Sequence, residues 1–297
     1  MSNIFADSLD SFIADMEQVA RLRPHTVRAY RYELQAAALQ FPAPLDTLTL
    51  SELERWAHRG EAAPSTVGRR IAALSRFFQW ARRHDLCEHN PLDGREPVRA
   101  RRRLPRPIRT GTERAIVDRA IGAAPQPYRL MLTLLRETGM RAGEVVALRI
   151  DDVVVEPGRE GLRVREPKNG SERYVHLGPH ATPRSLRGLR AHLKMLKDQP
   201  AHAPLFRSNR GTGISYDALH YQWSKLCAAA GLLDDEGKPR YTLHQLRHTR
   251  GTELIEQGQR MEIVQRALGH RDPRSTQLYA ELSDNQMREA LEQHRLE

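Results

Sequence analysis

Four residues near the C-terminal end of the chain have the types and the spacing to attack a phosphate ester. His244 and Arg247 lie three positions apart, so they share one face of a helix. His270 follows Leu268 and Gly269, and Tyr279 comes nine residues later. Arginine binds phosphate oxygens with a planar fork of donors and stays charged, and a tyrosine hydroxyl becomes a covalent nucleophile when a neighbour takes its proton. The pattern indicates nucleophilic attack on phosphate.

This segment resembles the second active-site box of the tyrosine recombinases, the phage-integrase and Xer family. The family pattern is His-x-x-Arg, then Leu-Gly-His, then the nucleophilic Tyr, and it extends over almost forty positions. A second segment, residues 138–145, resembles the first box, in which an arginine, here Arg141, binds the scissile phosphate. Glu144, one turn later, is expected to hold local structure. Taken alone, this Arg-x-x-Glu spacing would indicate only a surface ion pair.

A lysine lies at the turn of a predicted hairpin. Residues 162–165 and 173–177 have strand character, and Asn169-Gly170 is a favoured two-residue turn. A lysine beside a turn is usually just solvated. In the resembled family a lysine in this hairpin reaches the minor groove and protonates the leaving 5′ oxygen, so the resemblance implies this role for Lys168. The family usually has Gly-Lys-Gly and a second lysine, whereas this chain has Pro167 before Lys168 and Asn169 after it.

The resemblance implies a transesterification without a cofactor. Tyr279 would attack a DNA phosphodiester, leaving a 3′-phosphotyrosine link and a free 5′ hydroxyl. Arg141 and Arg247 would neutralise the phosphorane. A free tyrosine has a pKa of about 10, so His244 would help to handle its proton, and His270 would bind and orient the phosphate. The implied catalytic residues are Arg141, Lys168, His244, Arg247, His270 and Tyr279.

Metal-dependent DNA cleavage is the main chemical alternative. It needs two or three converging carboxylates. The acids near the two boxes are Glu144, Asp151 and Asp152, and the last two precede a strand as ordinary turn residues do. The two cysteines, Cys87 and Cys227, are far apart and form no zinc motif. We therefore expect no metal site.

Two other functions on the same fold stay open. One is a type IB topoisomerase-like enzyme that nicks and reseals DNA, which multimer formation on paired sites would separate from a recombinase. The other is a non-catalytic DNA-binding protein. The resemblance to Xer recombinases favours strand exchange on a double-stranded DNA recombination site, by a homo- or hetero-tetramer on two paired sites. It would serve chromosome or plasmid dimer resolution, and so chromosome partition at cell division, or mobile-element integration. A DNA translocase or accessory protein is a possible partner.

Composition supports a nucleic-acid partner. The 297 residues carry a formal net charge of +10, with a sequence pI of about 10.0, and a basic balance of this size favours a polyanion. No apolar run approaches the roughly 20 residues of a membrane span. The N-terminus has no basic stretch followed by an apolar core, so no secretory signal is predicted. A cytoplasmic, nucleoid-associated location without membrane contact is expected.

Helical periodicity and breakers predict two domains in a mainly α fold with a small antiparallel β-sheet. Residues 1–88 would be a helical DNA clamp of four helices. The first is predicted over 8–22, with Val19 inside it, and the second begins after a cap at Thr26. The third is predicted over 49–58 with Ser51 as its cap, and the fourth over 65–83. This region resembles the family's core-binding (SAM-like) domain. Residues 89–109 form a basic, proline-rich linker, and 110–297 an α+β catalytic domain. Its last helix, residues 283–295, packs on its own domain or, as in the resembled family, on a neighbouring protomer.

Arginines of the N-terminal region and the linker form a basic set. Three recur every seven residues along the fourth predicted helix, two more lie on the second, and a run fills the linker. Such a face is often merely solvated, but together they favour contacts to the DNA backbone, which position a protein without sequence readout. The expected backbone contacts are Arg28, Arg31, Arg69, Arg76, Arg83, Arg101, Arg102 and Arg103.

Overall fold

The computed structural model describes residues 4–20, 22, 24–95, 106–165 and 172–269. It divides the chain into two compact units, Met1–Arg102 and Arg103–Glu297. The fold is mainly helical with one small antiparallel sheet, the class predicted from the sequence. None of the described helices is long and apolar enough to cross a membrane.

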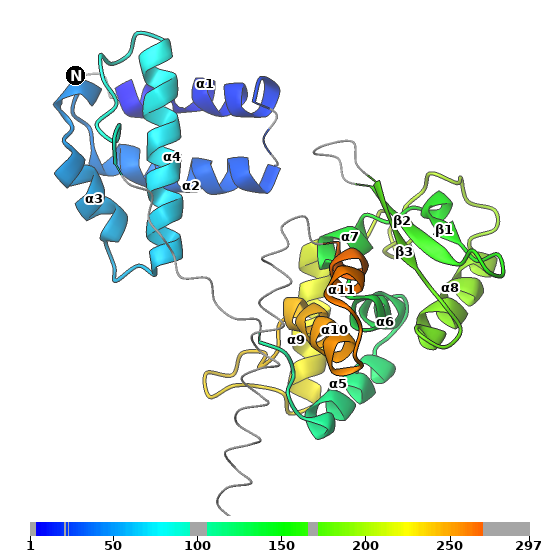
Figure 1. The fold of residues 1–297 in the computed structure, drawn as a ribbon. Helices are drawn as coiled ribbons and strands as arrows, with labels where there is room; N and C mark the ends of the chain where they lie inside the picture. Colours follow the sequence, from blue (N-terminus) through cyan, green and yellow to red (C-terminus); the bar gives the residue numbers. More distant parts are fainter. Residues whose placement is uncertain (1–3, 21, 23, 96–105, 166–171, 270–297) are drawn as a thin grey trace, which may run out of the picture. The chain divides into compact units, whose positions relative to one another are not determined.

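The N-terminal unit is built on an antiparallel helix pair. Helix α4 crosses the pair formed by α1 and α2 (Figure 1). Aromatic rings fill the crossing, and those of Phe5 and Phe77 stack with centroids 4.3 Å apart. One face of α4, including Val67, Ile71, Leu74 and Phe78, is buried along the helix. The elements are α1 (Ile4–Gln18), α2 (Pro24–Gln40), the 3₁₀ turn η1 (Leu45–Thr47), α3 (Leu50–His58) and α4 (Pro64–Arg83).

Boundaries of three predicted helices in this unit were wrong. Helix α1 begins at Ile4 rather than at residue 8, and it ends at Gln18, which leaves Val19 outside it and 76% exposed. Helix α2 starts at Pro24, ahead of the predicted Thr26 cap, because a proline in the first turn needs no N–H partner.

The third error concerns the cap of α3, which is Thr49 rather than Ser51. Thr49 donates its backbone N–H to the Glu52 carboxylate at 2.9 Å, and its hydroxyl accepts from the Glu52 N–H. Thr49 and Ser51 both fit the capping-box spacing, because each has a glutamate three residues later. The Thr49 frame is adopted because it buries Leu48 before the cap and Leu53 after it, the two positions of a hydrophobic staple.

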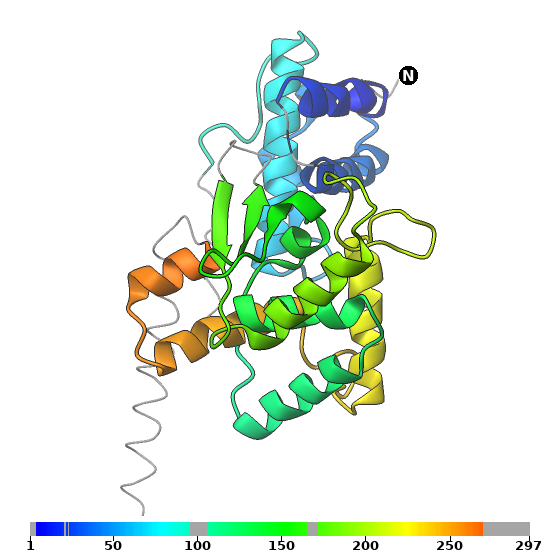
Figure 2. The same ribbon diagram turned by 90° about the vertical axis from the view of Figure 1, so that its right-hand side faces the viewer.

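The C-terminal unit is organised around the buried helix α6. Every described side chain from Leu130 to Thr138 on α6 is buried, and α5, α8 and α10 contact this helix (Figures 1 and 2). Gly188 lets α8 approach closely, since an added Cβ would lie 2.6 Å from Leu130. The helices are α5 (Gly111–Ala123), α6 (Tyr128–Thr138), α7 (Ala142–Val146), α8 (Pro183–Met195), α9 (Tyr216–Ala229), α10 (Leu243–Glu256) and α11 (Met261–Leu268).

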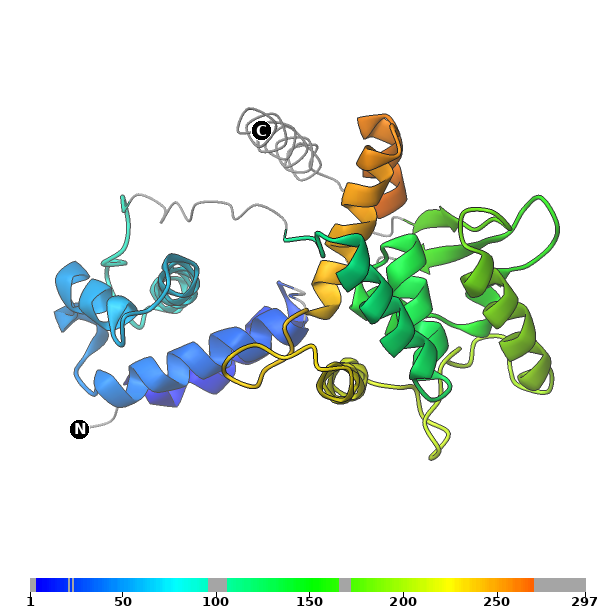
Figure 3. The same ribbon diagram turned by 90° about the horizontal axis from the view of Figure 1, so that it is seen from below.

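A three-stranded antiparallel sheet lies at one side of this unit, in the order β1-β2-β3. The strands are β1 (Val153–Val154), preceded by the 3₁₀ turn η2 (Ile150–Asp152), β2 (Gly161–Arg165) and β3 (Glu172–His176). In this register Val164 faces Arg173. Helices α10 and α11 pack against each other (Figure 3), with Val264 and Leu268 buried against Leu254 and Ile255.

Candidate active site

The turn between α6 and α7 places the first predicted phosphate ligand. Gly139 ends α6 in the left-handed conformation, with φ 69°. The turn lies close to α11, because a Cβ added to Gly139 would be 2.6 Å from Leu268 Cδ2. Arg141 then caps α7 in extended backbone, and Glu144 accepts its backbone N–H at 2.8 Å. The backbone of Arg141 is thus held in place by its bond to Glu144 at the start of α7.

Helix α10 carries the second pair of predicted residues. A capping box begins the helix: Thr242 donates its N–H to Gln245 Oε1 at 2.8 Å, and its hydroxyl accepts from the Gln245 N–H. This start places His244 in the first turn. Arg247 follows one turn later, only 2% exposed, and its Nη1 donates to the Gly139 carbonyl oxygen at 2.7 Å. The two sequence boxes are therefore joined by a direct hydrogen bond.

The partly buried carboxylate of Glu144 links Arg141 to the sheet. Glu144 Oε1 accepts from Arg141 Nη1 at 2.8 Å, and Glu144 Oε2 accepts from Arg173 Nη2 at 2.6 Å. Arg141 Nη2 also reaches the Gly269 carbonyl oxygen at 3.5 Å. These contacts are structural, as predicted for Glu144. They bring α7, β3 and the end of α11 around Arg141.

His244 is held in its neutral form. Desolvation by the surrounding protein, together with the charges of Arg247 and Arg141, lowers the pKa of His244 below its ordinary value. Its ring packs edge-on against that of His248, with centroids 4.5 Å apart. A neutral imidazole beside two guanidiniums is able to accept a proton.

Arg173 is the site residue that the sequence interpretation missed. It was placed only within a predicted strand. Its signal was its position in the alternation of β3, where Glu172, Tyr174 and His176 are exposed while Val175 is buried. Arg173 thus falls on the inward face, opposite the buried Val164. An inward-facing arginine needs a partner, and that partner is Glu144.

Three of the predicted catalytic residues, Lys168, His270 and Tyr279, lie outside the described residues, as do Arg101, Arg102 and Arg103. The described ranges contain no group of three or more His, Cys, Asp or Glu side chains arranged to hold a metal ion. The described part of the site consists of Arg141, Glu144, Arg173, His244 and Arg247.

The predicted backbone-contact arginines of the N-terminal unit fall into two groups. Arg69 Nη2 is 2.8 Å from the buried Glu33 carboxylate, and Arg31 pairs with Asp10 at 2.6 Å. The first group therefore consists of Arg31 and Arg69, which use side-chain donors on carboxylates of their own unit. Arg28 belongs to neither group, and it is exposed.

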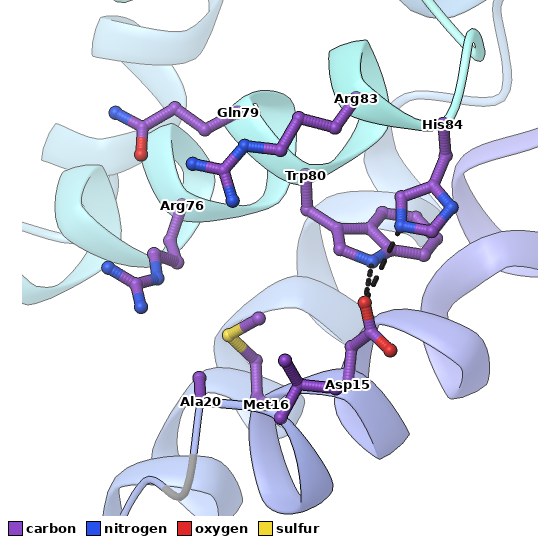
Figure 4. A pocket seen from close by; sticks show the side chains of 9 residues that line it. Asp15, Met16, Ala20, Arg76, Gln79, Trp80, Arg83 and His84 are labelled. Atoms are coloured by element: carbon purple, nitrogen blue, oxygen red, sulfur yellow. Dashed lines mark hydrogen bonds and ion pairs between the residues drawn. The ribbon is translucent and has the colours of Figure 1, made fainter.

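Arg76 and Arg83 form the second group. With Gln79 they line one side of a hollow of about 140 Å³ on α4 (Figure 4). Asp15 and Met16 of α1 also line this hollow, and Asp15 Oδ2 accepts from Trp80 Nε1 of α4 at 2.8 Å.

Two family models match the chain. That of the phage integrase family covers residues 112–286, and that of the phage integrase N-terminal SAM-like domain covers residues 9–85. The chain belongs to the phage integrase family. It is a tyrosine-type site-specific DNA recombinase, a class of strand transferase that acts without metal.

Curated relatives and solved structures agree with this membership. The chain is 30% identical to tyrosine recombinase XerC of Chromohalobacter salexigens over 91% of this chain and 90% of that protein. It is 26% identical to XerC of Pseudomonas syringae pv. syringae over 92% and 91%. The fold is similar to that of a lambda integrase tetramer bound to a Holliday junction, with a TM-score of 0.66 and 22% identity over 89% of this chain and 78% of that one.

Proposed function

We propose that this recombinase cuts DNA through Tyr279, forming a 3′-phosphotyrosine bond, and then exchanges strands between two paired sites. The observation that supports it is the hydrogen bond from the buried Arg247 to the Gly139 carbonyl. That bond holds the α10 guanidinium against the turn that carries Arg141, so two permanent cations belong to one site. Two such cations match the charge that develops on a phosphorane.

Each predicted residue receives a role in this proposal. Arg141 and Arg247 neutralise the phosphorane. His244, neutral because its pKa is lowered, accepts the Tyr279 proton. His270 binds and orients the phosphate, and Lys168 donates a proton to the leaving 5′ oxygen. The free 5′ hydroxyl of another strand then attacks the phosphotyrosine, which restores both the DNA bond and the Tyr279 hydroxyl.

The partners follow from the same reaction. The substrate is a double-stranded recombination site, bound by residues 1–88 and 110–297 across the linker at 89–109. Arg28, Arg76, Arg83 and the linker arginines contact the backbone. Strand exchange needs four protomers on two sites, either of one kind or with a second recombinase, and the similar fold of a lambda integrase tetramer supports this arrangement.

The biological role that we propose is Xer-like. The identity to XerC proteins over most of both chains supports chromosome or plasmid dimer resolution in the cytoplasm, at the nucleoid, coupled to partition and cell division. Integration or excision of a mobile element is the second role on the same chemistry. A DNA translocase or accessory protein would then control when exchange occurs.

The test is a plasmid that carries two directly repeated copies of a site obtained by binding selection from a random duplex pool. Wild-type protein should convert it to two smaller circles, and Tyr279→Phe should not. Relaxation of supercoils without smaller circles would instead indicate a nicking and resealing enzyme.

A further inference from the structure

The Glu144 carboxylate lies between two guanidiniums that have different surroundings. The side chains of Glu144 and Arg173 are 12% and 16% exposed, whereas that of Arg141 is 42% exposed. Each carboxylate oxygen is the acceptor for one arginine, Oε1 for Arg141 and Oε2 for Arg173. Arg173 is thus the less exposed of the two partners, and Arg141 is the more exposed one.

Arg173 changes the charge available at the site. Burial opposes ionisation of Glu144, but Arg173 and Arg141 together hold its pKa below the ordinary value, so the carboxylate is ionised. Without Arg173, this charge would be matched by Arg141 alone, in a pair of net charge zero. With Arg173 present, two guanidiniums, those of Arg141 and Arg173, share the one carboxylate, so the cluster of three side chains carries a net positive charge.

We propose that Arg173 is a positioning residue for strand cleavage, which occupies and neutralises Glu144 so that Arg141 keeps donors and charge for the scissile phosphate. This inference rests on the function proposed above. Arg141 uses Nη1 on Glu144, while its Nη2 has only a long contact of 3.5 Å to the Gly269 carbonyl among the described residues. That nitrogen is the donor that a phosphate would take over.

Arg173 also contacts the end of α11. Its Nη1 lies 3.4 Å from the Ala267 carbonyl oxygen, and a Cβ added to Gly269 would be 2.5 Å from its Nε. The same guanidinium therefore touches the residues that immediately precede His270. Arg173 could therefore act by holding the end of α11 in place or by compensating the charge of Glu144. A second mutation that neutralises Glu144 should restore cleavage only if charge compensation is the role of Arg173.

The experiment measures single-turnover cleavage of a nicked suicide duplex at saturating DNA. Arg173→Gln should cleave about 10- to 100-fold more slowly, because Glu144 then holds Arg141 as its only counter-ion. The double variant Arg173→Gln/Glu144→Gln should cleave at least about tenfold faster than Arg173→Gln. Glutamine still accepts the Arg141 N–H but carries no charge. Arg173→Lys keeps the charge and should stay within about threefold of wild type.

Arg190→Gln is the matched control. Arg190 pairs with Glu160, whose side chain is 10% exposed, at 3.1 Å, and neither residue touches the site residues described above. This variant should cleave at the wild-type rate. Thermal unfolding and DNA affinity are measured for each variant, so that folding and binding are separated from chemistry.

Two results would overturn the inference. One is a wild-type cleavage rate in Arg173→Gln. The other is a double variant, or an Arg173→Lys variant, that folds and binds DNA but cleaves as slowly as Arg173→Gln. That result would indicate that Arg173 holds the end of α11 in place and does not act by charge compensation. If wild type formed no covalent adduct on DNA that it binds, the proposed function itself would fail, and this inference with it.

Discussion

At the scale of single residues, the described site contains one buried arginine, Arg247, and one more exposed arginine, Arg141. Arg247 is 2% exposed, and its Nη1 donates to the Gly139 carbonyl oxygen. Arg141 is 42% exposed and shares its carboxylate with Arg173. A buried guanidinium acts strongly on a phosphate, because little water screens it.

His244 offers a test of this electrostatic environment. Its lowered folded-state pKa means that the unfolded chain binds the proton more tightly, so the stability linked to His244 is present above pH 6.5 and is lost as the pH falls below it. In the DNA-free protein we expect the His244 ring signal in NMR to titrate below pH 6.5. The signal is assigned as the one missing from His244→Gln. A midpoint at or above 6.5 would contradict the described environment.

Residue types and spacing were enough to predict Arg141, His244 and Arg247, because each lies in a short segment with a fixed helical offset. They were not enough for Arg173, whose importance depends on a contact with Glu144, 29 positions earlier. Strand alternation alone marked it as inward-facing. Only the packing of β3 against α7 shows which acid it meets.

At the scale of elements, the start of α10 determines where His244 and Arg247 lie. Thr242→Ala removes the capping box and should lower the free energy of unfolding by about 1 kcal/mol. Ser215→Ala removes the cap of α9, where Ser215 accepts from the Ala218 N–H, and should cost about the same. Urea denaturation measures both losses. Only Thr242→Ala should also slow DNA cleavage, and equal cleavage rates in the two variants would contradict the positioning role of the cap.

The α6–α7 turn is a second element whose geometry can be tested. Gly139→Ala should destabilise the protein more than Gly231→Ala. Both glycines have positive φ, 69° and 68°, which costs alanine about 1 kcal/mol. Only at Gly139 would the new Cβ meet another side chain, Leu268 Cδ2 at 2.6 Å, and overpacking adds about 1–3 kcal/mol. Equal losses in urea denaturation would show that α11 yields without cost.

Most elements could be predicted because apolar periodicity, glycine stops and caps agree locally. The α3 start could not, because Thr49 and Ser51 both have a glutamate three residues on. The choice between them depended on burial of Leu48 and Leu53 in the core of the unit, which is a tertiary effect. The same limit applies to α1, whose apolar pattern continues past its real end at Gln18.

At the scale of the whole molecule, the basic charge should appear as salt dependence. DNA affinity should fall with a log–log slope of about −0.9 for each phosphate contacted. Replacing both Arg76 and Arg83 by alanine should flatten the slope by about 2 and leave the cleavage rate at saturating DNA unchanged. Arg82→Ala, on the same helix but paired with Asp93 at 2.8 Å, is the control and should keep the slope. A slope that neither change alters would exclude the α4 arginines as phosphate contacts.

The most direct test of the central claim is the covalent adduct itself. A nicked suicide duplex carrying the selected site is incubated with wild type and with Tyr279→Phe in the presence of EDTA. Denaturing gels and mass spectrometry of the DNA-linked peptide then locate the bond. We predict an adduct in wild type alone, on the peptide that contains Tyr279. An adduct that persists in Tyr279→Phe, or no adduct in wild type that binds the site, would contradict the account.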